Sequence, residues 1–286
     1  MNTERIDRIL QAFDGPTDKY CRAEVDEAVT LREEITPRLL GVLDELVAAP
    51  EEHCERDSLL HAYAAALLAH FEEPTAHLPI IRAFSLPEET EDLLWGDLST
   101  ELLPTLLFKT CGGKVDALKK SILDRGANES LRASAIDALS LTALTGIVPR
   151  EEVLAFFAGL FTGAEADRES AFWSQVAATA TDLWPEEILP ALRQAFDDGL
   201  VAPSYVGWDE IEASVAVPRE DALARERERL ERRLPANAHD YLSGWFCFAP
   251  KRAPTVEVEK RIARAERARK KAKKKQAKQS RKKNRR

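Results

Sequence analysis

Apolar residues recur at helical spacing through most of this chain, and proline and glycine punctuate them at short intervals. Four predicted helix starts contain a proline: Thr36-Pro37, Pro74, Pro149 and Pro185. Proline is favoured in the first turn of a helix because the N–H that it lacks would have no partner there. Glycines able to adopt the left-handed cap follow at the stops: Gly112-Gly113, Gly126, Gly163 and Gly199. Because strand-like alternation is nearly absent, the pattern predicts an all-α protein.

The punctuated helices repeat as pairs, each an Ala-rich apolar helix followed by an amphipathic one. Four units are predicted, at 56–86, 97–125, 129–163 and 167–199. Their second helices end near Phe84, Ile122, Phe161 and Phe196, which are 38, 39 and 35 residues apart. This period is near the lower end of the HEAT and armadillo range. The prediction is a HEAT-like α-solenoid of stacked helix pairs, and an irregular helical bundle is the alternative.

The regularity fades after Gly199, where Pro203, Gly207 and Pro218 interrupt the chain. The charged segment 218–234 predicts a solvated capping helix, with acid-to-base pairs four residues apart at Asp221–Arg225 and Glu228–Arg232. The aromatic segment YLSGWFCF (241–248) is expected to pack Trp245, Phe246 and Phe248 onto the last repeat.

Charge divides the chain into two predicted parts. Residues 251–286 hold 18 of the 41 Lys and Arg and three of the 49 Asp and Glu, which leaves this tail at +15 and residues 1–250 at −23. The prediction is an acidic HEAT-like domain over 1–250 and a polybasic tail over 251–286 that is disordered, or helical on binding. Phosphate contacts are assigned to Lys270, Lys271, Lys273, Lys274, Lys275, Lys278, Arg281, Lys282, Lys283, Arg285 and Arg286. A merely solubilising tail, or a tail that folds back on the acidic body, remains open.

No motif predicts catalysis, a metal or a cofactor. The four cysteines are far apart, which favours reduced thiols and a cytoplasmic protein. Cys111 beside Lys114 is a weak nucleophile candidate, because it is expected at a helix C-terminus. His70 and His77 could approach across a turn, although a packed histidine is the commoner arrangement. Adjacent acid pairs such as Glu186-Glu187 suit solvated first turns of helices.

Several segments together resemble a bacterial family, domain of unknown function 1186, which is a HEAT-like helical repeat family. They are REEITPRLL (32–40), LPTLLFKTCGG (103–113), PEEILPALRQAFDDGLV (185–201) and GWFCF (244–248), and the resemblance covers roughly 20–248. It implies no activity and no catalytic residues. Members often end in a cysteine-rich SEC-C zinc motif, whereas no cysteine follows Cys247 here, so the polybasic tail stands in that place.

The functional prediction is a non-enzymatic adaptor. The solenoid would bind an unknown protein partner, and the tail would dock to RNA, the ribosome or another polyanion. No membrane association and no small-molecule ligand are predicted, because the tail lacks a bulky apolar face and no ligand motif occurs. An enzyme with an unrecognised site is the remaining alternative.

Overall fold

A computed structural model describes residues 2–15, 19–56, 58–245 and 248 of the chain. These residues form sixteen α-helices and three short 3₁₀ helices and contain no β-strand, which confirms the all-α prediction. The N-terminal helices are α1 (Asn2–Phe13), α2 (Arg22–Thr30), α3 (Arg32–Ala48) and α4 (Pro50–Cys54).

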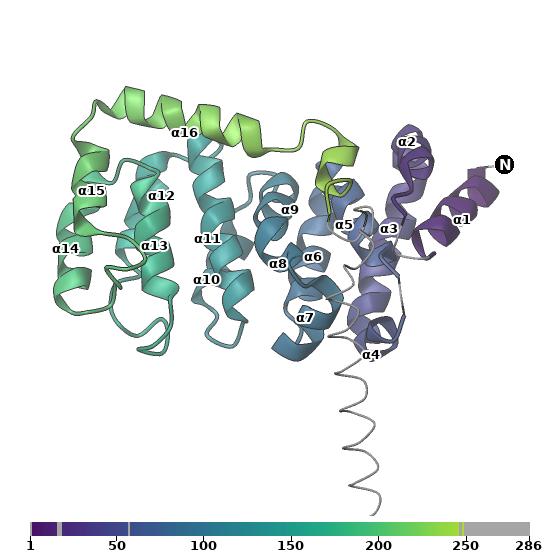
Figure 1. The fold of residues 1–286 in the computed structure, drawn as a ribbon, viewed down its shortest axis with the longest axis horizontal. Coiled ribbons are helices and arrows are strands. Elements are labelled where there is room, and N and C mark those ends of the chain that lie inside the picture. The colour runs from purple at the N-terminus through teal and green to yellow at the C-terminus, as the bar shows by residue number, and fades with distance from the viewer. Residues whose placement is uncertain (1, 16–18, 57, 246–247, 249–286) are drawn as a thin grey trace, which may run out of the picture. The chain divides into compact units, whose positions relative to one another are not determined.

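Helix pairs follow, stacked side by side as expected of a HEAT-like solenoid (Figure 1). The pairs are α5 (Leu60–His70) with α6 (His77–Phe84), α9 (Leu103–Thr110) with α10 (Asp116–Leu123), α11 (Glu129–Leu144) with α12 (Arg150–Ala158), and α13 (Phe172–Thr181) with α14 (Leu189–Asp197). Short helices η1 (Pro74–Ala76) and η2 (Glu186–Ile188) lead into α6 and α14, and α7 (Glu88–Trp95) and α8 (Leu98–Glu101) are inserted before α9. The chain continues through α15 (Trp208–Val215), α16 (Arg219–Arg233) and η3 (Ala238–Tyr241).

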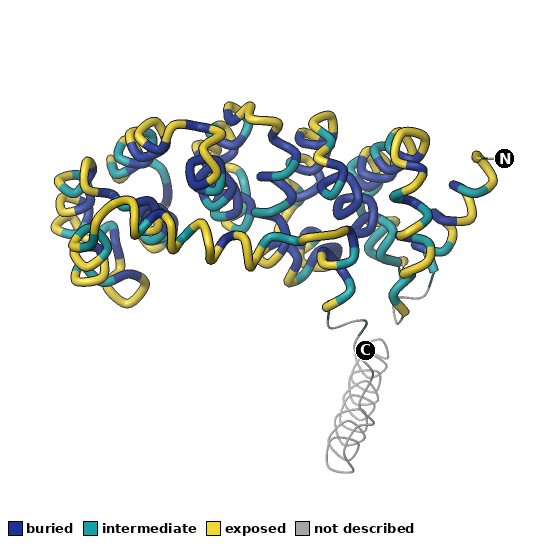
Figure 2. The backbone as a smooth tube through the Cα atoms, turned by 90° about the horizontal axis from the view of Figure 1, so that it is seen from above, coloured by how far each residue is buried: buried dark blue, intermediate teal, exposed yellow. Residues whose placement is uncertain are grey.

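The first helices of the pairs form the centre of the stack. Helix α5 packs on α3 and α9, and α11 packs on α9 and α13. Every residue from His61 to Ala69 of α5 is buried, as expected of a helix that is apolar on all sides. Its alanines let neighbouring helices approach closely, and dark blue segments accordingly follow the middle of the stack in Figure 2.

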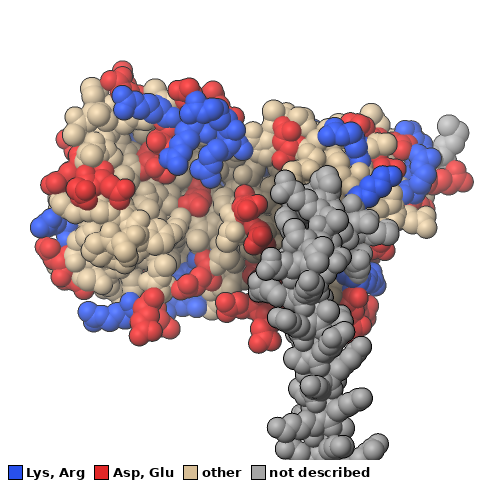
Figure 3. Space-filling view, viewed as in Figure 1, with Lys and Arg blue, Asp and Glu red and all other residues tan. Residues whose placement is uncertain are grey.

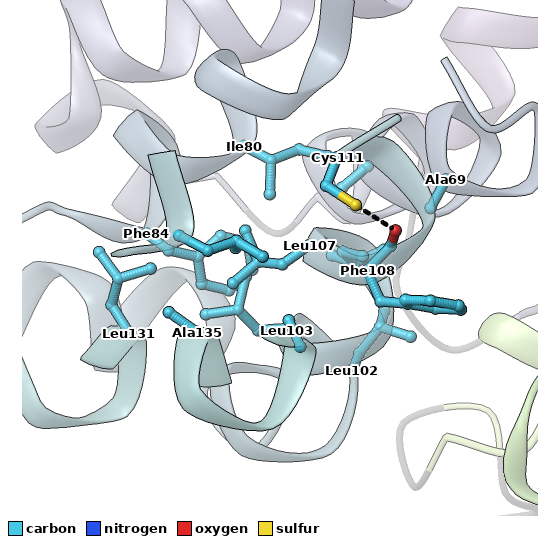
Figure 4. Close-up of a cluster of buried hydrophobic side chains, with 14 of the residues drawn as sticks. Ala69, Ile80, Phe84, Leu102, Leu103, Leu107, Phe108, Cys111, Leu131 and Ala135 are labelled. Carbon is cyan, nitrogen blue, oxygen red and sulfur yellow. Dashed lines mark hydrogen bonds between the residues drawn. The ribbon is translucent and has the colours of Figure 1, made fainter. Parts of the chain in front are cut away.

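The core is continuous from one pair to the next. In Figure 4, Leu103 and Leu107 of α9 lie beside Phe84 of α6 and Ala135 of α11, and all four are fully buried. Burying a large apolar side chain stabilises a fold by roughly 1.5–3 kcal/mol. Because each pair shares these contacts with its neighbours, the pairs stabilise one another along the row.

Two of the four predicted anchor residues are buried as expected, and two are not. Phe84 and Ile122 are inaccessible to solvent, whereas Phe161 and Phe196 are only partly buried. Phe161 lies beyond the end of α12, and the fully buried phenylalanine of that helix is Phe157. The helix ends at Ala158, before the expected position, so the residue one turn earlier faces the core.

The proline signals mark helix starts with one exception. Pro74 begins η1, and Pro149 and Pro185 occupy the position immediately before α12 and η2. Pro37 is wrong as a start, because α3 begins at Arg32 and contains it. Two glutamates in the first turn favour the earlier start through the helix dipole, and the proline removes a single backbone hydrogen bond near that end.

Arginines join consecutive pairs through backbone carbonyl groups at the end of α10 and in the loops that follow α12 and α13. The buried Arg132 guanidinium donates to Ile122 O at 2.9–3.0 Å and to Glu165 O at 2.8 Å. Arg150 likewise donates to Leu183 O at 3.0 Å and to Trp184 O at 2.8 Å. Carbonyls at the end of a helix and in the loop after it lack partners within the helix, so these bonds satisfy them and fix the spacing of the pairs.

The segment after Gly207 is a strap along the stack. The predicted charged helix forms as α16 and is mostly exposed to solvent, whereas the prediction that Phe248 packs on the last repeat is wrong. Phe246 lies outside the described residues. Helix α16 packs on α15 and α11, and η3 then packs on α2 and α5, near the other end of the row (Figure 1). Phe248 packs against Tyr20 and Tyr63, with ring centroids 5.3 and 6.2 Å apart. Of the two expected ion pairs, Glu228–Arg232 forms at 2.5 Å. Asp221 and Arg225 are both among the described residues and form no ion pair with each other. Contacts with distant helices decide the path of this segment.

Candidate functional site: a polar cleft beneath helix α16

A cleft of about 420 Å³ lies between helix α16 and the first helices of three consecutive pairs. Helices α9, α11 and α13 lie in a row, so their matching faces provide a continuous floor. The charged and hydrogen-bonding side chains around the cleft are Thr100, Glu101, Thr105, Asp137, Ser140, Gln175, Thr179, Asp182, Tyr205, Glu226, Arg229 and Arg233. Concave sites with a few converging polar groups are where proteins usually bind ligands.

Asp137 of α11 is at the centre of a hydrogen-bond network on this floor. Its Oδ1 accepts bonds from Gln175 Nε2 at 2.8 Å and from the buried Thr179 Oγ1 at 2.9 Å, both on α13. Burial raises the pKa of the Asp137 carboxyl group, and the two hydrogen bonds oppose that rise. The network therefore fixes the carboxylate between α11 and α13.

Asp182 follows the last residue of α13 and occupies the same cleft. Asp182 is exposed to solvent, although the other residues that line the cleft stand around its carboxyl group. Burial among these residues raises the pKa of Asp182 to about 6, and the nearby carboxylate of Glu226 adds to the rise. Arg229 acts in the opposite direction. Asp182 can therefore change its charge in mildly acidic solution.

Helix α16 contributes both signs of charge to the cleft. Arg229 Nη1 lies 3.5 Å from Glu226 Oε2 one turn away, and Arg233 also lines the cleft. Figure 3 shows basic side chains grouped over α16 and acidic ones on the face below it. Four carboxylates and two guanidinium groups line the cleft, so its interior is net negative when all of them are ionised.

A second, smaller hollow of about 80 Å³ adjoins the cleft between α11 and α13. Ala133, Ile136 and Phe172 give it an apolar lining, and the Arg132 guanidinium lies 4.0 Å from the centroid of the Phe172 ring. Gln175 and Tyr205 line both hollows, and the Tyr205 hydroxyl donates to Gln175 Oε1. The two hollows therefore form one groove along α11.

The strap is anchored at its far end by a hydrogen-bonded histidine. His239 Nε2 lies 2.9 Å from Asp26 Oδ1, and His239 Nδ1 lies 2.8 Å from the Tyr20 hydroxyl. A carboxylate at Nε2 places the proton there in the neutral ring, so Tyr20 donates to Nδ1. Burial raises the pKa of Tyr20 to about 12, which makes its hydroxyl a poor nucleophile at neutral pH. We read this trio as a structural contact between η3 and α2.

The eleven basic residues assigned to polyanion binding, Lys270 to Arg286, lie outside the described residues. Cys111 directly follows α9, at the helix C-terminus as predicted. It is buried, its Sγ lies 3.1 Å from Phe108 O (Figure 4), and burial raises the pKa of its thiol. A thiol in this environment is not activated as a nucleophile.

The paired histidines are also placed by the structure. His77 is buried with Nδ1 3.1 Å from Thr110 Oγ1, and burial lowers its pKa to about 4. His70, at the end of α5, packs instead against the ring of Tyr241 on η3, with ring centroids 6.3 Å apart. Within the part of the chain that the structure describes, no group of three or more His, Cys, Asp or Glu is arranged to hold a metal ion.

Sequence reasoning missed the two carboxylates at the centre of the cleft. Asp137 and Asp182 are single acids in or directly after Ala-rich first helices, in ASAIDALSL (133–141) and QVAATATDLW (175–184). A lone acid in such a helix is the available signal, whereas adjacent acid pairs such as Glu186-Glu187 are the more conspicuous pattern in the sequence. The proximity of the two depends on how α11 packs against α13 and cannot be read from either segment alone.

The fold and the cleft together define an all-α protein of stacked helix pairs with a polar groove. The chain belongs to the family described as "Protein of unknown function (DUF1186)", whose model matches residues 4–249. An uncharacterised protein of Chlamydia trachomatis serovar D is 28% identical over 227 residues, covering 78% of this chain and 89% of that protein. An uncharacterised protein of Chlamydia muridarum is 28% identical over 224 residues, covering 77% and 89%. No solved structure matches the chain. No helix among the described residues is long and apolar enough to cross a membrane.

Proposed function

We propose that this protein is a non-enzymatic interaction scaffold, which binds a partner protein through the groove on its first helices and a polyanion through its basic C-terminal segment. The observation that carries the first half is the cleft beneath α16, because three consecutive helix pairs contribute to its floor. Stacked helical proteins characteristically use such extended faces to bind other proteins.

The charge of the cleft favours a cationic partner. Neither Asp137 nor Asp182 forms an ion pair within the described residues, although Asp137 accepts two neutral hydrogen bonds. A carboxylate in restricted solvent gains most from a guanidinium or ammonium group that supplies both charge and donors. A Lys or Arg side chain of a partner protein would provide these.

Binding explains the groove better than catalysis does. Carboxyl groups with raised pKa values also serve general acid–base chemistry, which usually pairs them with a nucleophile or a second catalytic group in a closed pocket. The cleft instead opens along three helices, and the acids and arginines of α16 occupy its edge. Cytoplasmic localisation is part of the proposal, supported by the free thiols of Cys21, Cys54 and Cys111, and cell fractionation tests it.

The basic segment supplies the second half of the proposal. Its eleven assigned Lys and Arg, Lys270 to Arg286, would contact phosphates without reading base sequence, because no aromatic residue follows Phe248. RNA, free or within the ribosome, is the polyanion we expect. Each phosphate neutralised on a single strand should add about 0.7 to the slope of log K against log salt.

The test compares the full-length protein with a full-length variant in which these eleven residues are changed to Gln. We expect the wild type to co-sediment with ribosomes or structured RNA at low salt and the variant to lose at least ten-fold in affinity. Equal sedimentation of the two proteins would refute the tail as the anchor. Salt-dependent compaction in small-angle scattering, lost in the variant, would instead favour the fold-back alternative.

Affinity capture with the same two proteins tests the scaffold itself. Proteins captured by both must attach to the body, whereas those lost from the variant depend on the tail. Capture of no protein above a bead control, after cross-linking in cells, would refute the scaffold proposal.

A further inference from the structure

The two hollows between α11 and α13 have different linings and share a wall. The larger one holds Asp137 and Asp182. The apolar lining of the smaller one comes from Ala133, Ile136 and Phe172, and its wall also contains Arg132 and the hydrogen-bonded pair Ser170–Glu129. A ligand that entered both would therefore need a cationic group and an apolar group at a fixed separation.

The small hollow has the character of an aliphatic side-chain pocket. Its volume of about 80 Å³ admits a branched aliphatic group and is too small for a further folded element. The guanidinium of Arg132, which lines this hollow, donates hydrogen bonds to Ile122 O and Glu165 O. These donors are therefore already used within the fold. The pocket consequently offers contact area, with few free donors.

Tyr205 provides a platform between the two hollows. Its side chain is half exposed, and its hydroxyl donates to Gln175, which fixes the ring without covering its face. Rigid, partly exposed tyrosines contribute strongly to protein interfaces because they bury a large area at low entropic cost. The face of such a ring also attracts cations.

The separation of the hollows fits an extended peptide. Ala133 in the small hollow and Asp137 in the cleft are four residues apart on α11, which corresponds to about 6 Å at the helical rise. Two residues of an extended chain span about the same distance. The flexible stem of a basic side chain takes up the remaining difference.

We propose that this groove binds an extended segment of a partner protein in which a Lys or Arg enters the cleft and an aliphatic residue, two to four positions away, enters the small hollow. The inference rests on the proposed scaffold function and specifies what its body binds. Charge complementarity selects the basic residue, and the apolar hollow beyond Tyr205 selects its neighbour.

The binding should depend on pH through Asp182. This carboxylate faces Glu226, Arg229 and Arg233 of α16 and Asp137 of α11. Protonation near pH 6 removes a negative charge from the cleft, so affinity for a basic peptide should fall as the pH is lowered through that value. An Asp182→Asn variant should bind more weakly and show a flatter pH profile.

The experiment measures fluorescence anisotropy of labelled ten-residue peptides with the full-length protein. The probes carry one Arg and one Leu, separated by two, three or four positions in a Gly/Ser background, and matched probes replace Arg by Gln or Leu by Ser. We expect the Arg–Leu probes to bind at least ten-fold more tightly than either matched probe.

The variants locate the site. Asp182→Asn and Tyr205→Ala should each weaken binding of the best Arg–Leu probe about ten-fold. The matched control is Asp198→Asn, the same substitution directly after α14, at a position that lines neither hollow. It should change affinity by less than two-fold.

Three outcomes would overturn the proposal. They are the absence of any preference for Arg–Leu probes, equal weakening by Asp198→Asn and Asp182→Asn, and binding that appears only when residues 251–286 are neutralised, which would make the chain's own tail the occupant. If the probes fail while the body still captures proteins, the groove assignment is wrong and the scaffold stands. If capture also fails, both proposals are wrong.

Discussion

Phe157 and Phe161 offer a direct test of how the helix pairs are held together, because they are identical residues one turn apart in the sequence. Phe157 is fully buried inside α12, and Phe161 lies past its end and is partly buried. Replacing a fully buried phenylalanine by alanine costs about 3–5 kcal/mol, since the lost contacts leave a cavity. A partly covered ring should cost about half of that.

The assay is thermal unfolding of the full-length variants, followed by circular dichroism. For a body of this size, each kcal/mol lowers the midpoint by roughly 2–4 °C. Phe157→Ala should therefore lower it by about 12 °C and Phe161→Ala by about 6 °C. If Phe157→Ala does not fold, Phe157→Leu and Phe161→Leu should keep the same order with smaller shifts. Equal shifts, or a larger shift at Phe161, would refute the packing described for α12.

Three further predictions follow from single groups. Because burial raises the pKa of Asp182 in the folded state, the folded protein binds more protons than the unfolded one between about pH 4 and pH 6. Stability should fall as the pH rises through that window, and Asp182→Asn should remove this part of the slope in denaturant titrations. Arg150→Met removes the hydrogen bonds to the Leu183 and Trp184 carbonyls after α13, which should lower the free energy of unfolding by about 2–4 kcal/mol. The backbone amides of that segment should also exchange faster with solvent. Cys111 should react with a thiol reagent only on unfolding, whereas the more exposed Cys54 should react in the native protein, as peptide mass mapping would show.

Each of these outcomes can go the other way. A pH profile of Asp182→Asn that parallels the wild type would show that this carboxyl is not buried by the cleft wall. Native-state labelling of Cys111 at the rate of Cys54 would contradict its burial. An Arg150→Met midpoint within 1 °C of the wild type would show that the bonds to the carbonyls after α13 add little to the stack.

The cleft illustrates which parts of a site can be inferred from sequence. Acidity of the body can be counted from the composition, and it favours basic partners. Which carboxylates converge is a different matter, because Asp137 and Asp182 are 45 positions apart and meet only through the packing of α11 against α13. The Arg229 and Arg233 side chains line the cleft from α16. The sequence of this segment predicts a charged helix and does not indicate that it lies over α11.

The sequence by itself determined the all-α class, the order of the helix pairs and the buried character of Ala-rich helices such as α5. These properties depend on residues three or four positions apart and on proline and glycine at helix ends, so a short window carries the signal. It also determined the opposite charges of residues 1–250 and 251–286.

Only the tertiary structure decided that the strap returns to the N-terminal helices. His239 meets Asp26 and Tyr20 more than 200 positions away, and Phe248 packs on Tyr63. Such contacts depend on the length of the completed stack and on which apolar surfaces it leaves uncovered. No local pattern encodes that geometry, because the surface that receives the strap exists only after the helix pairs have packed.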